Sequence, residues 1–139
     1  MHLPDTLAAD RCACGCDACG PAIPAGLDLA RARDTELGLY RVELEDVPVS
    51  ADDPASLVAF VTRRLDGAPA DAHVAISGGR PRCRCTAPVE LAITRGDPGR
   101  FQTAPFSFPS PGWWILRVTV SGDAGWDAVT FNLAIGVSE

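Results

Sequence analysis

From Leu37 to the end of the chain, apolar and polar side chains alternate in short runs, a period that suits strands rather than helices. Tyr40, Val42 and Leu44, for example, alternate with charged residues. Such alternation is typical of an antiparallel strand with one buried face and one solvated face. The runs that predict strands are residues 40–45, 57–63, 72–76, 89–94, 100–108, 114–120 and 129–135.

Turn residues separate these runs. Asp66-Gly67 ends the second run with a dipeptide that readily adopts the positive φ angles of a tight hairpin, and Gly96-Asp97-Pro98-Gly99 reverses the chain after the fourth. A parallel α/β fold would need helical crossovers, and the sequence shows none. Residues 37–139 therefore predict an all-β fold, an immunoglobulin-like antiparallel β-sandwich of about seven strands.

Residues 1–36 have a different composition, in which Cys, Ala, Gly, Pro and Asp dominate and no period persists. A short helical turn over residues 27–33 is possible, although Gly26 and its small length weaken the signal. The sequence thus predicts two parts: a Cys-rich N-terminal arm at 1–36 and the sandwich at 37–139.

Net charge and hydropathy limit the classes of partner that this chain can have. The net charge is -6 and the 12 basic residues are scattered, which argues against a nucleic-acid partner. No apolar run approaches the roughly 20 residues that span a bilayer, so no membrane span is expected. The first residues lack the basic and apolar regions of a signal peptide, which favours a cytoplasmic location.

Six cysteines are the most distinctive chemical feature of the sequence. In an extended segment, residues two apart project to the same side, and Cys-x-x-Cys can wrap a tetrahedral ion. This spacing predicts a thiolate site for a metal ion, Cu(I) or Zn(II). The candidate ligands are Cys12, Cys14, Cys16, Cys19, Cys83 and Cys85.

One arrangement of these ligands is a four-thiolate site that pins the arm to the sandwich, formed by Cys16, Cys19, Cys83 and Cys85. Cys12 and Cys14 would then be spare, or would extend the site to a polynuclear cluster. Disulfides are the main rival, since six cysteines allow 15 connectivities, and free or redox-active thiols are a third reading. The spacing does not match common iron–sulfur motifs.

Nearby side chains bear on this chemistry. Arg80, Arg82 and Arg84 interleave the second cysteine pair and would lower the thiol pKa values by stabilising the anion, or would be solvated charges. His73 lies on an outward face and is expected to be a surface histidine rather than an added ligand. Alternation also places Trp114 in the core. Its neighbour Trp113, together with Trp126, is expected to be partly exposed, as at a partner surface.

Four segments carry a resemblance to a known family: Gly38 to Val42, Asp66 to Val74, Pro98 to Phe108, and Pro111 to Val118. In this order they resemble the YtkA-like/FixH-like family of bacterial immunoglobulin-like domains, which are typically exported or membrane-anchored. The resemblance therefore implies the periplasm or cell envelope, against the cytoplasmic location favoured above.

Many members of that family carry a Met-Pro-x-His-x-His-like segment, thought to bind or deliver copper in some of them. This chain reads Arg80-Pro81-Arg82-Cys83-Arg84-Cys85 at the matching place. Two cysteines replacing two histidines would keep two ligands at the same spacing and shift the preference toward thiophilic ions.

The sequence contains no nucleophile-and-base motif, no paired carboxylates and no phosphate-binding loop, so we expect no enzyme activity. The leading hypothesis is a metal-binding accessory or chaperone-type module that uses cysteine thiolates. The alternative is a non-catalytic structural or assembly subunit, whose cysteine arm is held by a structural metal or by disulfides and which joins a protein partner or larger assembly.

Overall fold

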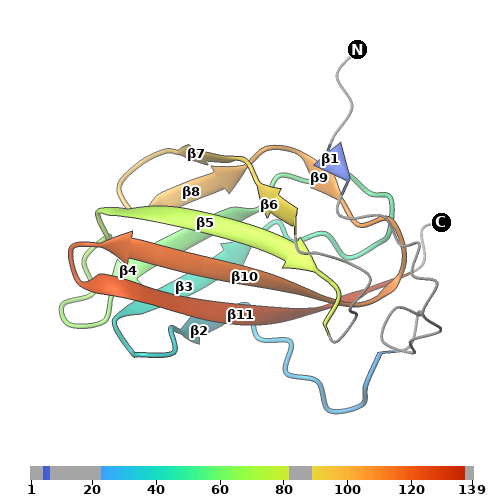
Figure 1. Cartoon of the computed structure of the whole chain (residues 1–139), viewed down its shortest axis with the longest axis horizontal. Coiled ribbons are helices and arrows are strands. Elements are labelled where there is room, and N and C mark those ends of the chain that lie inside the picture. The colour runs from blue at the N-terminus through green and yellow to red at the C-terminus, as the bar shows by residue number, and fades with distance from the viewer. Residues whose placement is uncertain (1–4, 7–22, 82–88, 137–139) are drawn as a thin grey trace.

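A computed structural model describes residues 5–6, 23–81 and 89–136. Two antiparallel sheets pack face to face (Figure 1), and the described residues contain no helix, hence none that could cross a membrane. The strands are β1 (Asp5–Thr6), β2 (Ala32–Asp34), β3 (Tyr40–Glu45), β4 (Val58–Arg63), β5 (Ala72–Gly79), β6 (Val89–Leu91), β7 (Ile93–Arg95), β8 (Arg100–Thr103), β9 (Phe106–Ser107), β10 (Gly112–Gly122) and β11 (Gly125–Ile135).

One sheet has the strand order β11-β10-β5-β6 and the other β2-β3-β4-β8-β7. β1 stands apart from both and pairs in parallel with β9. The predicted all-β antiparallel sandwich is confirmed. It has more strands than predicted because two of the expected runs are divided and neither β1 nor β2 was foreseen.

The run at 89–94, predicted as one strand, is divided between the two sheets. β6 pairs with β5 through Ile76↔Leu91, whereas β7 pairs with β8 through Ile93↔Thr103. Between them the carbonyl of Ala92 accepts a hydrogen bond from the amide of Ala104, 2.8 Å away. Alternation stays regular across the division because both halves keep an inward face, so the sequence pattern does not reveal it.

The chain reverses at Asp66-Gly67 as expected, but the two flanking strands do not form a hairpin. Gly67 has φ 69°, and its amide donates to the carbonyl of Arg63 at 2.8 Å, so the chain does reverse here. The strands on either side do not pair with each other, because β4 belongs to the five-stranded sheet and β5 pairs with β10 in the other sheet. This turn is therefore the crossover between the sheets.

Residues 27–33 form no helix. Ala32–Asp34 instead extends the five-stranded sheet as β2, with Ala32 opposite Glu43 of β3. Residues in the part of the chain predicted to be an arm thus pair with the sandwich.

The inward faces follow the predicted alternation. Tyr40, Val42 and Leu44 are buried while the charged residues between them are exposed, and Trp114 is fully buried. The hydroxyl of Tyr40 donates to the carbonyl of Gly125 at 2.7 Å, which ties the two sheets together at one end of the sandwich.

Asp127 is a buried carboxylate on the inward face of β11. It accepts hydrogen bonds from the hydroxyl of Thr35 at 2.6 Å and from three backbone amides, those of Leu37, Leu39 and Ala128. Burial by itself raises the pKa of Asp127, but the four donors outweigh it and hold the pKa below its ordinary value. Asp127 therefore fixes the β2–β3 turn to the opposite sheet.

Sequence analysis missed this role, although a signal was present. Asp127 has the same parity as Val129 and Phe131, so alternation places its side chain on the core side. An acidic residue in such a position needs several donors, because an isolated buried charge is strongly destabilising.

Candidate functional site

The six candidate ligands fall in two segments of the chain. Cys12, Cys14, Cys16 and Cys19 lie within residues 7–22, and Cys83 and Cys85 lie within residues 82–88. Both segments are outside the described residues, so the thiolate site stays a prediction. The described residues that flank these two segments show at which end of the sandwich each segment begins and ends.

The second pair belongs to a hairpin connection. β5 ends at Gly79 and β6 begins at Val89, and the two strands pair antiparallel with Gly78 opposite Val89. Residues 80–88 therefore join two neighbouring strands at one end of the four-stranded sheet. Arg80 and Pro81, the first residues of this connection, are buried.

Arg80 packs against the end of the core. Its guanidinium carbon lies 4.2 Å from the ring centroid of Trp114, a cation–π contact. The same group donates to the hydroxyl oxygen of Ser110 at 2.6 Å and to the carbonyls of Pro111 and Trp113 at 2.9 and 3.3 Å. Arg80 is buried, so the expectation that it is a solvated charge is wrong for this residue. Its structural role at the end of the core was not predicted by sequence analysis.

On the N-terminal side of the arm segment, β1 reaches the same end of the molecule. Asp5–Thr6 pairs with Phe106–Ser107, and the ring of Phe106 lies 5.6 Å from that of Phe108. The ring of Phe108 in turn lies 5.2 Å from that of Trp114, the ring on which Arg80 stacks. A continuous aromatic cluster therefore connects β1 with the start of the β5–β6 connection.

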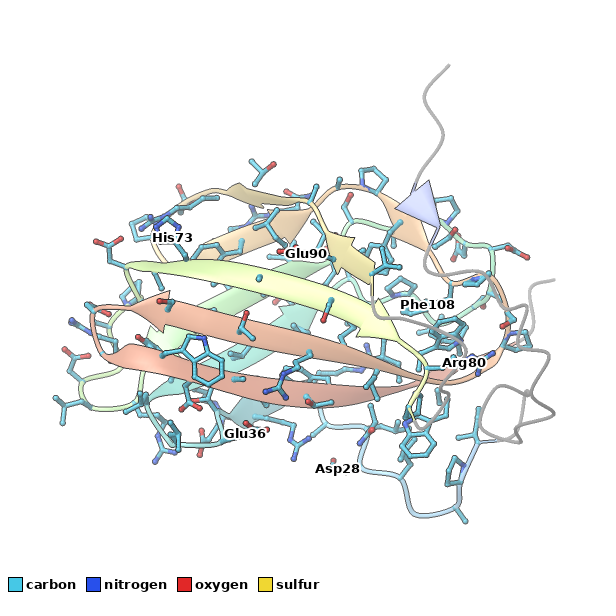
Figure 2. The ribbon with its side chains drawn as sticks, viewed as in Figure 1. Asp28, Glu36, His73, Arg80, Glu90 and Phe108 are labelled. Atoms are coloured by element: carbon cyan, nitrogen blue, oxygen red, sulfur yellow. The ribbon has the colours of Figure 1, made fainter. Side chains whose placement is uncertain are left out.

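On the C-terminal side of the arm segment, Asp28 docks nearby. Its carbonyl accepts from the side-chain amide of Asn132 at 3.1 Å, and the side-chain oxygen of Asn132 accepts from the indole N–H of Trp113 at 3.0 Å. Trp113 is the residue whose carbonyl receives a hydrogen bond from Arg80. Figure 2 shows Arg80 and Phe108 toward one end of the sandwich, and Asp28 at the lower margin, between that end and the middle. We call Phe108, Trp113, Trp114 and Asn132 the aromatic end.

His73 lies away from the aromatic end. It is exposed at the start of β5, opposite Ser121, and seven residues of extended chain, about 23 Å, separate it from Arg80. The expected surface location of His73 is confirmed. In the described ranges, no group of three or more His, Cys, Asp or Glu side chains is arranged to hold a metal ion.

The fold and these contacts define an antiparallel β-sandwich domain with an aromatic end. No family model and no curated protein matches the sequence. A solved structure, that of a DUF4426 family protein from Pseudomonas aeruginosa PAO1, is similar with a TM-score of 0.56. It shares 15% sequence identity, and the match covers 78% of this chain and 98% of that one. At this identity the likeness shows the fold alone.

Proposed function

We propose that this chain is a metal-binding accessory module that holds Cu(I) or Zn(II) through cysteine thiolates. The observation that carries the proposal is the convergence of chain segments on the aromatic end. β1 and Asp28, which flank the four-cysteine segment, and Arg80, which precedes Cys83, all contact it directly or through one neighbour. Segments that leave from one end of a domain need little added chain to meet, so closing a shared site between them has a low entropic cost.

The chemistry of the ligands supports the same proposal. Thiolates suit soft ions such as Cu(I) and also Zn(II), and four sulfurs match the tetrahedral geometry of a closed zinc site. The resemblance to YtkA-like/FixH-like domains, some of which are thought to handle copper, favours Cu(I) and a transferable ion. No family model supports that resemblance, so it enters only as a part of the proposal.

The test compares two double variants of the full chain, purified without oxygen from metal-replete cells. In the four-thiolate arrangement, Cys83→Ser with Cys85→Ser removes half of the ligands and should abolish tight metal binding. Cys12→Ser with Cys14→Ser is the matched control and should retain one metal ion per chain. Metal content by mass spectrometry and the number of free thiols after denaturation are measured together.

Wild-type protein without metal, and with no free thiols after denaturation, would refute the proposal and establish a disulfide-linked sandwich. If metal is present, its transfer to a chelator separates two roles. A delivery module should lose its ion to a competing thiol ligand without unfolding, whereas a structural ion should leave only as the fold opens.

A further inference from the structure

The outward face of β5, β10 and β11 differs in character from the rest of the surface. Among the outward positions of these three strands, Arg117 is the only Lys, Arg, Asp or Glu. On β3 of the other sheet, by contrast, Arg41, Glu43 and Glu45 all point outward and are exposed. Figure 2 looks onto this weakly charged face, with His73 and Glu90 along one margin and Glu36 along the other. A sheet face with so few charged side chains is typical of an interface.

This face contains a hollow and a protruding side chain. The hollow has a volume of about 250 Å³, and its floor consists of small residues, Ala75 and Ser77, beside Thr119. Arg117 and Glu90 stand at its sides. The small side chains of β5 leave this space open between the longer side chains of Arg117 and Glu90.

Trp126 is the protruding side chain. It lies on the same face, opposite Ser121 at the start of β11, and 55% of its surface is exposed. In the part of the chain that the structure describes, its indole N–H donates no hydrogen bond, and the carboxylate of Glu90 has no ion-pair partner. An exposed tryptophan is the kind of residue that dominates the binding energy of small interfaces.

We infer that this face binds a second copy of the chain, with Trp126 of each copy seated in the hollow of the other. The two features complement each other chemically. The small side chains of the hollow accept the apolar ring, and the carboxylate of Glu90 offers an acceptor for the indole N–H. Arg117 borders the hollow, and its guanidinium is held by the hydroxyl of Thr130 at 3.2 Å and by the carboxylate of Glu36 at 3.5 Å. Because both features lie on one face, a single two-fold axis within the interface satisfies both contacts.

The geometry sets the expected strength. Trp126 and the hollow are offset both along and across the strands, so the axis runs diagonally and the two sheets cross at a large angle, one of the two ways in which sheets pack face to face. The three strands form a face about 36 Å long and about 14 Å wide, so two such faces that cross at a large angle overlap over only about 200–300 Å² per copy, or about 400–600 Å² in total. This area is below the lower limit of about 1,000 Å² for specific interfaces, so we expect a weak dimer with a Kd of about 100–1,000 µM.

Sedimentation velocity of the full chain, from about 10 µM to about 1 mM, tests the inference. Reductant and a chelator are present throughout, so that neither disulfides nor shared metal ions can link two chains. Wild-type protein should form dimers, and the emission of Trp126, taken as the difference from Trp126→Phe, should shift to shorter wavelength with concentration. Trp126→Ala removes the side chain that enters the hollow, and Thr119→Arg fills the hollow itself. Each substitution should weaken dimerisation by at least about tenfold.

Leu65→Ala is the matched control, because Leu65 is 97% exposed but lies in the β4–β5 turn rather than on this face. It should dimerise as the wild type does. A wild-type chain that stays monomeric at about 1 mM, or dimers that survive both Trp126→Ala and Thr119→Arg in folded protein, would overturn the inference. A monomeric result is also what a face reserved for a different protein would give.

Discussion

Replacing Asp127 with alanine should destabilise the fold more than any surface change. The carboxylate accepts hydrogen bonds from the hydroxyl of Thr35 and from the amides of Leu37, Leu39 and Ala128. Each hydrogen bond to a charged acceptor contributes about 1.5–3 kcal/mol, but part of that gain offsets the desolvation of the carboxylate itself. We therefore expect the free energy of unfolding to fall by about 3–5 kcal/mol, a large share of the 5–15 kcal/mol typical of a domain.

Urea denaturation of the wild type, Asp127→Ala and the control Glu43→Ala measures this loss. Glu43 is an exposed carboxylate on β3, and its replacement should change stability by no more than about 0.5 kcal/mol. A loss below about 1 kcal/mol in Asp127→Ala would show that water replaces the carboxylate at these donors. The bond network would then not be what joins the β2–β3 turn to the opposite sheet.

The same carboxylate makes stability depend on pH. Because the pKa of Asp127 is lower in the folded chain than in the unfolded chain, its contribution is fully present above the unfolded-state pKa of about 3.9. The contribution is lost as the pH falls through the folded-state value. Asp127→Asn should be less stable at neutral pH and should lose less stability on acidification. Equal acid sensitivity in both proteins contradicts this assignment.

Three further substitutions follow from the packing. Arg80→Met should lower the unfolding free energy by about 2–4 kcal/mol, and Arg80→Lys should not restore it, since lysine cannot reproduce a planar group that stacks on Trp114 and reaches several acceptors. Tyr40→Phe should cost about 1–2 kcal/mol through the lost bond to Gly125, measured by urea titration. Gly99→Ala should cost more than Gly38→Ala in thermal melts: both glycines have positive φ, but only at Gly99 would the added carbon lie 2.8 Å from a backbone oxygen. Equal losses of stability at the two glycines would show that the positive φ, and not the close approach to the backbone oxygen, sets the cost of the substitution.

Local patterns were sufficient for the inward faces. The alternation around Tyr40 and around Trp114 identified which side chains are buried, because the two-residue period of a strand does not depend on its partner. The cysteine spacing likewise indicated a type of chemistry. It could not indicate a site, since the distance between the two cysteine groups depends on how the chain between residues 19 and 83 folds.

Pairing partners could not be read from the same patterns. The run at 89–94 is divided because its first half pairs with the preceding strand, β5, and its second half with the following strand, β8. The crossover at Asp66-Gly67 depends on β10, which is far away in sequence. The sequence also gave no reason to place Trp126 and the hollow beside Ser77 on one face. That placement follows from the register of β5 on β10.

By itself, then, the amino-acid sequence determined that the chain forms strands and which side chains face the core, and it showed that the most distinctive reactive groups are six cysteines. Only the tertiary structure decided which strands share a sheet, that Asp127 joins the two sheets, and that Arg80, β1 and Asp28 reach one aromatic end. The physical reason is that alternation is a property of a few neighbouring residues. Sheet pairing and buried polar contacts, by contrast, are selected by the packing of the whole core.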